Sequence, residues 1–160
     1  SAAGAIPRLI DLGVNPKVIG SALNVVLAQR LVRKLCQVCK KEAVPTEKQA
    51  KYISLTLESA KIKKIDVGLI DPNKVWVAGP GCTACNNIGY KGRIGVYEAV
   101  VMDAAIEKLI DQNPSEREIS KAAIPQGILN MTEDGIIKVL RGITSFEEVE
   151  RVVELGDVLA

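Results

Sequence analysis

The sequence contains no histidine and few aromatic residues, namely one Trp, three Tyr and one Phe. Without histidine, no Ser/His/Asp or Cys/His catalytic arrangement is possible, and no imidazole is available to bind a metal ion. The scarcity of aromatic rings also argues against a platform on which nucleic-acid bases would stack. Hydrolases that depend on such catalytic arrangements are therefore excluded.

A phosphate-binding loop and a membrane span are missing as well. No two glycines are spaced as in G-x-x-x-x-G-K-[ST], so we expect the chain by itself not to hydrolyse a nucleotide. The longest apolar stretch, residues 18–28, is shorter than the roughly 20 residues of a spanning helix. Residues 1–4 lack the basic and apolar regions of a signal peptide, so the expected compartment is the cytoplasm, where thiols stay reduced.

Charge is distributed unevenly along the chain, although its apolar (48%) and charged (25%) fractions are those of a soluble globular protein. Residues 1–64 carry a net charge of +8 and residues 65–160 a net charge of −6. Such a dipole suits head-to-tail contact between identical subunits. Two solvated faces with unrelated charge would give the same pattern, and both interpretations stay open.

The spacing of apolar residues predicts a mainly helical α+β fold. Helices are expected at residues 2–12, 16–34 and 46–60, with several more from residue 103 to the end. Strands are expected at residues 74–78 and 93–102. Three capping-box patterns mark helix starts: Thr46 with Gln49, Ser115 with Glu118, and Thr144 with Glu147.

All four cysteines fall into two Cys-x-x-Cys pairs, Cys36 with Cys39 and Cys82 with Cys85, separated by 42 residues. Two residues between ligands let a tight knuckle direct both sulfurs at one ion, and two knuckles complete a tetrahedron. Four thiolates leave no open position for water, so we expect a structural zinc site that clamps the intervening residues at their base. Redox pairs, disulfides and unrelated buried thiols are the alternatives.

The segment Gly79-Pro80-Gly81-Cys82 follows a predicted strand and matches the letters of a dinucleotide-binding fingerprint. That fingerprint needs a helix at the turn, because the helix N-terminus supplies the amides that bind phosphate. Here the turn enters the second cysteine pair instead. We therefore expect no cofactor at this turn.

Basic residues flank the first cysteine pair, namely Arg33, Lys34, Lys40 and Lys41. We expect them to offset the negative charge of the metal centre.

Several longer motifs occur together in this chain. They are AGAIPRL at residues 3–9, AQRLVRKLC at residues 28–36, C-x-x-C-x-x-x-G-Y-x-G-R-x-G at residues 82–95, D-G-I-x-K at residues 134–138 and G-I-T-S-x-E-E-V at residues 142–149. Together they resemble the GspE/PilB family of secretion ATPases, which powers type II secretion and type IV pilus assembly. The likeness covers nearly the whole chain and is least specific at residues 43–78.

The resemblance implies that the chain is the C-terminal fragment of a longer ATPase and contains its tetracysteine metal-binding domain. Residues 1–35 would be the last helices of a RecA-like ATPase domain, 36–92 a zinc-knuckle insertion with a small β element, and 93–160 a C-terminal helical subdomain. The P-loop and the histidine box belong to the part of the family that precedes this segment. ATP and Mg2+ would therefore bind only in the full-length parent, and the fragment alone would be inactive.

Two arginines match family positions that support ATP hydrolysis near subunit contacts. Arg8 lies in Gly-Ala-x-x-Arg-Leu and Arg93 in Gly-Tyr-x-Gly-Arg. A guanidinium is always charged and pairs bidentately with phosphate or carboxylate, which fits such a role. Each could instead form a structural ion pair, Arg8 with Asp11 and Arg93 with an acid of the C-terminal half.

The resemblance also implies the partners. The full-length parent would form a homohexamer and would contact the inner-membrane platform protein of its pilus or secretion system, cytoplasmic and peripheral to the inner membrane, without binding nucleic acid. A zinc-ribbon module that binds nucleic acid is the main alternative, because it also fits paired cysteines and a basic half. A redox protein that uses its Cys-x-x-Cys pairs is a third possibility.

Overall fold

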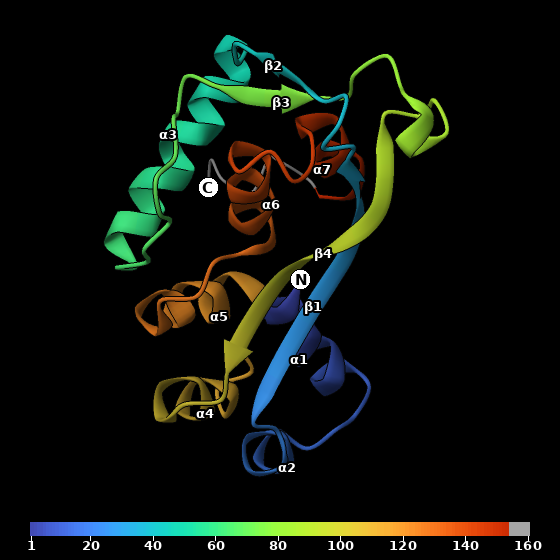
Figure 1. The fold of residues 1–160 in the computed structure, drawn as a ribbon. Coiled ribbons are helices and arrows are strands. Elements are labelled where there is room, and N and C mark those ends of the chain that lie inside the picture. The colour runs from blue at the N-terminus through green and yellow to red at the C-terminus, as the bar shows by residue number, and fades with distance from the viewer. Residues whose placement is uncertain (154–160) are drawn as a thin grey trace.

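The computed structural model describes residues 1–153, which form a mixed helix and sheet fold (Figure 1). Along the chain the elements are α1 (Ala2–Asp11), α2 (Pro16–Ala22), β1 (Val25–Leu35), β2 (Lys41–Ala43), α3 (Glu47–Ile62), β3 (Val75–Val77), the 3-10 helix η1 (Thr83–Cys85), β4 (Tyr90–Val101), α4 (Ala104–Ile110), α5 (Glu116–Ala123), the 3-10 helix η2 (Ile124–Gln126), α6 (Met131–Leu140) and α7 (Phe146–Val152). Within residues 1–153, no helix combines the length and apolar character that crossing a bilayer requires.

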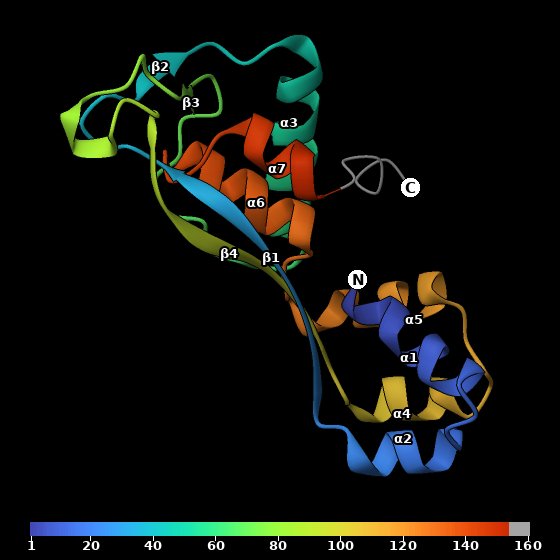
Figure 2. The same ribbon diagram turned by 90° about the vertical axis from the view of Figure 1, so that its right-hand side faces the viewer.

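A long antiparallel ribbon of β1 and β4 runs through the molecule and joins two lobes (Figure 2). Its register extends from Val25 opposite Val101 to Leu35 opposite Tyr90, with one irregularity near the second end. Helices α1, α2, α4 and α5 surround the first end and form what we call the helical lobe. The short β2–β3 sheet and helices α3, α6 and α7 surround the other end, together with both cysteine pairs, and form the knuckle lobe.

The predicted helix at residues 16–34 is wrong in its second half. Helix α2 starts with Asn15 as cap and Pro16 in its first turn, as expected, but it ends at Ala22. Leu23 is extended, and strand β1 follows from Val25. The backbone hydrogen bonds of this strand come from β4, whose paired residues lie 55 to 76 positions away in the sequence, which no local periodicity reveals.

Each lobe has its own apolar core, built from the faces that helical spacing predicted. In the helical lobe, Ile106 and Ile110 of α4 and Ile6 of α1 are fully buried. The knuckle lobe packs α3, α6 and α7 around a cluster made of Tyr52, Ile53, Val75, Ile136, Val139, Leu140, Phe146 and Val149. The inner face of the ribbon adds the buried pair Val32 and Val96, so the ribbon is part of both the connection and the core.

Two of the three predicted capping boxes are confirmed, at Thr46 with Gln49 and at Ser115 with Glu118. The third is wrong by one residue, because α7 is capped by Ser145, whose hydroxyl accepts the Glu148 amide. Thr144 is instead fully buried and donates its hydroxyl to the Arg33 carbonyl at 2.8 Å. In the sequence, both Thr144 and Ser145 could cap α7, because each is followed three residues later by a Glu. The contact of Thr144 with β1 leaves Ser145 as the cap.

Glu148 ties helix α7 to the ribbon. Its carboxylate is completely buried and accepts the Arg33 backbone amide at 2.7 Å and the Arg33 guanidinium at 2.7 and 2.9 Å. Arg151 donates to it as well, at 3.0 Å. Burial alone would raise the pKa of Glu148, but these donors stabilise the carboxylate and lower the pKa from 4.5 to about 2.

The Glu148→Gln variant tests this contact. It keeps the shape of the side chain but leaves Arg33 without its buried counter-charge, so we expect the free energy of unfolding to fall by about 3 kcal/mol. The control Glu150→Gln breaks only the exposed pair with Lys48, for which we expect less than about 1 kcal/mol. Urea denaturation measures both, and equal losses would contradict the assigned role of Glu148.

Stability should also depend on pH through this carboxylate. Because the folded pKa lies below the unfolded value, the stabilisation is complete above about pH 5 and is lost as pH falls from 4.5 toward 2. We expect the urea midpoint to drop more between neutral and acidic pH in the wild type than in Glu148→Gln. Parallel pH profiles of the two proteins would show that Glu148 does not carry this dependence.

Candidate metal centre

Both cysteine pairs lie at the end of the β1–β4 ribbon where Leu35 is opposite Tyr90. Cys36 follows directly after β1, and Cys85 closes η1 shortly before β4. The Cys36 amide donates to the Gly89 carbonyl at 3.0 Å, so the hydrogen bonding of the two strands continues into the knuckles. Residues 40–81 leave and return at this point, as expected for a segment clamped at its base.

The spacing of the four sulfurs is compatible with a tetrahedral zinc site. Sulfur to sulfur distances are 3.7 Å for Cys36 with Cys82, 3.8 Å for Cys39 with Cys85 and 3.7 Å for Cys82 with Cys85, and all four atoms lie within 4.8 Å of one another. Zinc to sulfur bonds of about 2.3 Å in a tetrahedron place the sulfurs about 3.8 Å apart. The cysteines are free, so the disulfide alternative does not describe this structure.

Two backbone amides stabilise the thiolate form of Cys85. The amides of Cys82 and Gly89 both donate to its sulfur at 3.2 Å. Burial by itself raises the pKa of the Cys85 thiol, but the two amides stabilise the anion more and bring the pKa to about 6. For Cys39, burial and the neighbouring thiols raise the pKa to about 12. A divalent cation is the kind of partner that would let all four sulfurs ionise together.

Glycines allow the second knuckle to pack against the first. A Cβ at Gly79 would lie 1.6 Å from the Cys39 carbonyl oxygen, and one at Gly81 would lie 2.5 Å from the Asn87 backbone. Gly81 also has φ +97°, a conformation that other residues rarely adopt. The segment Gly79-Pro80-Gly81 therefore serves the knuckle, and the element after it is the three-residue helix η1, too short for a phosphate site.

The first knuckle is held against the turn between α6 and α7. Gln37 and Lys40 both donate to the Gly142 carbonyl, at 3.1 and 3.0 Å, and the Lys40 ammonium stands 4.3 Å from the centre of the Trp76 ring. Of the basic residues expected to offset the metal charge, Lys40 and Arg33 are thus engaged with other partners. After the second knuckle, at the start of β4, the Tyr90 hydroxyl forms a hydrogen bond with the Ser145 hydroxyl at 2.9 Å.

The two arginines singled out from the sequence are exposed and lie in different elements. Arg8 is on α1 in the helical lobe, and Arg93 is on β4, directly opposite Arg33 in the ribbon. Within residues 1–153, neither arginine takes part in an ion pair, so the alternative pairings, Arg8 with Asp11 among them, are not formed. Their free guanidinium groups are available to groups outside this chain.

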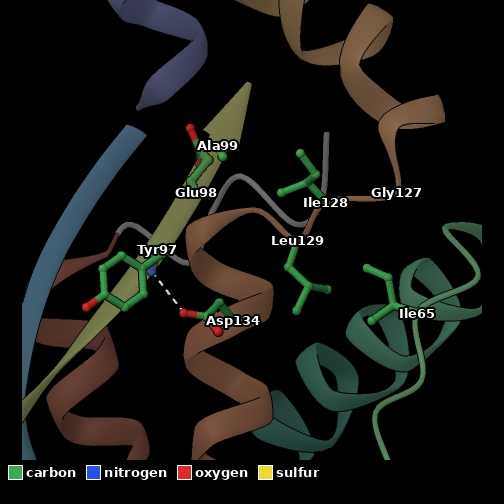
Figure 3. A pocket seen from close by; sticks show the side chains of 8 residues that line it. All are labelled: Ile65, Tyr97, Glu98, Ala99, Gly127, Ile128, Leu129 and Asp134. Carbon is green, nitrogen blue, oxygen red and sulfur yellow. Dashed lines mark hydrogen bonds between the residues drawn. The ribbon is translucent and has the colours of Figure 1, made fainter. Parts of the chain in front are cut away.

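A hollow beside the ribbon gathers none of the predicted site residues. It has a volume of about 330 Å³ and lies between the ribbon, the end of α3 and the start of α6 (Figure 3). Aliphatic side chains such as Ile65, Ile128 and Leu129 line most of it, and Asp134 is turned aside to accept the Tyr97 amide at 2.8 Å. The candidate centre is therefore the cysteine cluster.

Sequence reasoning missed the residues that brace this centre. The pairing of Arg33 with Glu148 and the contact of Tyr90 with Ser145 join segments more than fifty residues apart. The one available signal was Ser145 followed three residues later by an acid, the pattern of a helix N-cap. That signal places Glu148 in a first helical turn but says nothing of its burial against β1.

Comparisons with known proteins identify a family for this sequence. The family described as type II/IV secretion system protein matches residues 1–151. A type IV pilus assembly ATPase PilB from Thermus thermophilus is 38% identical over 92% of this chain and 15% of its own length. The type II secretion system ATPase E of Vibrio cholerae is 37% identical over 96% of this chain and 28% of its own length.

A third relative, the type IV pilus assembly ATPase PilB of Pseudomonas aeruginosa, is 38% identical over 96% of this chain and 25% of its own length. The chain thus spans between 15% and 28% of the length of these three relatives. The match nonetheless covers nearly all of residues 1–153, including both cysteine pairs and both arginines. The chain belongs to the type II/IV secretion system protein family.

Proposed function

We propose that this chain is the C-terminal assembly and coupling part of a hexameric ATPase motor that drives type IV pilus assembly or type II secretion. The observation that carries the proposal is the tetracysteine cluster at the end of the ribbon, in a chain whose relatives are named as ATPases of those two systems. In this proposal the chemistry belongs to the longer parent, which is cytoplasmic and peripheral to the inner membrane through its partners.

The three proposed parts keep the boundaries expected from the resemblance. Residues 1–35 are the end of a RecA-like ATPase domain, 36–92 the metal-binding insertion and 93–160 the C-terminal helical subdomain, of which 154–160 lie outside the described residues. Strand β1 ends the first part and β4 begins at the close of the second, so their pairing joins the parts side by side. A displacement of the first part is thereby passed to the insertion.

Zinc is the metal that fits the four sulfurs, and Cys36, Cys39, Cys82 and Cys85 would hold it. A centre with four thiolates is closed, so it contributes folding energy and shape rather than a reactive water. The knuckles keep the base of residues 40–81 fixed, and Gln37 and Lys40 hold that base to the turn before α7. The insertion can then present a constant surface to the platform protein.

Nucleotide chemistry requires groups that this chain does not supply. A P-loop is absent from the sequence, so ATP and Mg2+ are proposed to bind only in the full-length parent. Arg8 and Arg93 are exposed and without an ion pair in residues 1–153, which suits guanidinium groups that meet phosphate or a neighbouring subunit. We propose supporting roles for both in the hydrolysis carried out by the assembled ring.

Metal content tests the structural role of the cluster. The purified chain should contain zinc in equimolar amount, and removing it with a strong chelator should lower the free energy of unfolding by about 3 kcal/mol or more. Cys82→Ser should lose the metal, whereas Thr83→Ser, in the same knuckle but without a ligand atom, should keep it. Loss of metal with unchanged thermal unfolding would contradict the structural role.

Kinetics of the parent test the two arginines. Arg8→Lys and Arg93→Lys keep the charge but remove the bidentate fork, so each should lower the ATPase kcat by about tenfold or more while the melting temperature stays unchanged. The control Arg117→Lys changes another exposed arginine, on α5, and should leave kcat unaffected. Normal turnover in Arg8→Lys or Arg93→Lys would remove that residue from the proposal.

A further inference from the structure

A hollow of about 310 Å³ lies beside the first knuckle, on the outer side of the candidate metal centre. Lys34 and Lys91 stand at its rim, and Val38 and Ala84 contribute apolar surface from the two knuckles. Val38 occupies the tip of its knuckle and is 74% exposed. Its aliphatic side chain is therefore open to contact from outside the chain, next to the two lysines.

The two chain segments that line this hollow are basic. The two segments that carry the knuckles, residues 29–41 and 82–93, hold seven basic residues and no acidic residue. That charge exceeds the two negative charges of a zinc centre with four thiolates. Arg33 is neutralised by Glu148, but Lys34 and Lys91 form no ion pair in the described part of the chain.

The two free lysines are placed together by the backbone. Gly92 has φ +76°, which turns β4 at its start, and the Lys34 Cδ lies 4.0 Å from the position that a Cβ at Gly92 would take. The stem of Lys34 therefore runs along the residue next to Lys91. Two lysines that line the same hollow attract carboxylates of a partner more strongly than isolated surface lysines do.

The lining distinguishes between possible anionic partners. No aromatic ring lines the hollow, so nothing there would stack on a nucleic-acid base. A bilayer presents a flat surface of headgroups, whereas this surface is concave and combines aliphatic side chains with two lysines. A polypeptide with one aliphatic side chain between carboxylates matches both features.

We propose that this hollow receives an acidic, aliphatic segment of the partner protein that the insertion contacts. An aliphatic side chain of that segment packs between Val38 and Ala84, and carboxylates on either side of it pair with Lys34 and Lys91. The proposal rests on the proposed function, because it names the surface and the chemistry of the contact assigned there to the insertion. The buried cysteines beneath the hollow hold both knuckles in the required positions.

Fluorescence anisotropy with a labelled peptide of glutamate and leucine tests the proposal on the zinc-loaded chain. We expect the peptide to bind and its Kd to rise about tenfold in Lys34→Glu/Lys91→Glu. Val38→Ser should weaken binding by a similar factor, since it removes only the apolar contact. The control Lys17→Glu/Lys61→Glu makes the same change in net charge at two exposed lysines of α2 and α3 and should change the Kd less than twofold.

Three outcomes would overturn the proposal. One is equal weakening by the control double variant, which would show a general charge effect. Another is unchanged binding in Val38→Ser, which would show that the apolar hollow is unused. The third is tighter binding of short single-stranded DNA, or of vesicles containing phosphatidylglycerol, than of the peptide at the same salt concentration. Zinc content and thermal unfolding of each variant ensure that lost binding is not lost structure.

The peptide assay separates this inference from the proposed function. Binding is measured on the chain itself and does not require ATP hydrolysis, pilus assembly or secretion by the parent. Peptide binding at Lys34, Lys91 and Val38 in a parent without ATPase activity would keep the inference and reject the motor. An active motor whose knuckles ignore the peptide would do the reverse.

Discussion

The antiparallel pairing of β1 with β4 is the constraint on which the rest of the structure depends. Its register ends with Leu35 opposite Tyr90, so both cysteine pairs arrive at the same end of the ribbon. The 42 residues between the pairs would otherwise form a long loop whose closure costs entropy. Because the ribbon already brings the loop ends together, four thiolates need to fix only the last few ångströms. The metal centre is thus a consequence of strand pairing as much as of cysteine spacing.

Further hydrogen bonds from α7, and from the turn before it, hold β1 and the first knuckle in place. Buried Glu148 binds the backbone and the guanidinium of Arg33, so α7 holds strand β1 three residues before Cys36. The Gly142 carbonyl accepts from Gln37 and Lys40, so the turn before α7 holds the knuckle itself. A buried charge with several donors tolerates little rearrangement, because any displacement leaves it unpaired in a region of low dielectric. These contacts therefore favour a fixed position of the first knuckle relative to β1 and α7.

The sequence predicted those features that depend on short spacing. The Cys-x-x-Cys pairs, the capping boxes at Thr46 and Ser115 and the family motifs are local, and the structure brings the four predicted cysteines together. Strand β1 was predicted as a helix because its partner β4 lies far away in the chain, and the cap of α7 was misplaced because Thr144 and Ser145 are both followed by an acid three residues later. Packing against β1 decided between them. The contacts of Glu148 with Arg33 likewise become visible only once distant segments are adjacent.

We propose that a single zinc ion, held by Cys36, Cys39, Cys82 and Cys85, fixes the base of an insertion that contacts a partner. X-ray absorption at the zinc edge of the purified chain tests this claim most directly, since it reports the atoms bound to the metal. The account predicts four sulfur ligands at about 2.3 Å and none of nitrogen or oxygen. Oxygen or nitrogen among the zinc ligands would contradict the proposed site. So would a protein that purifies without zinc and still shows the native fold.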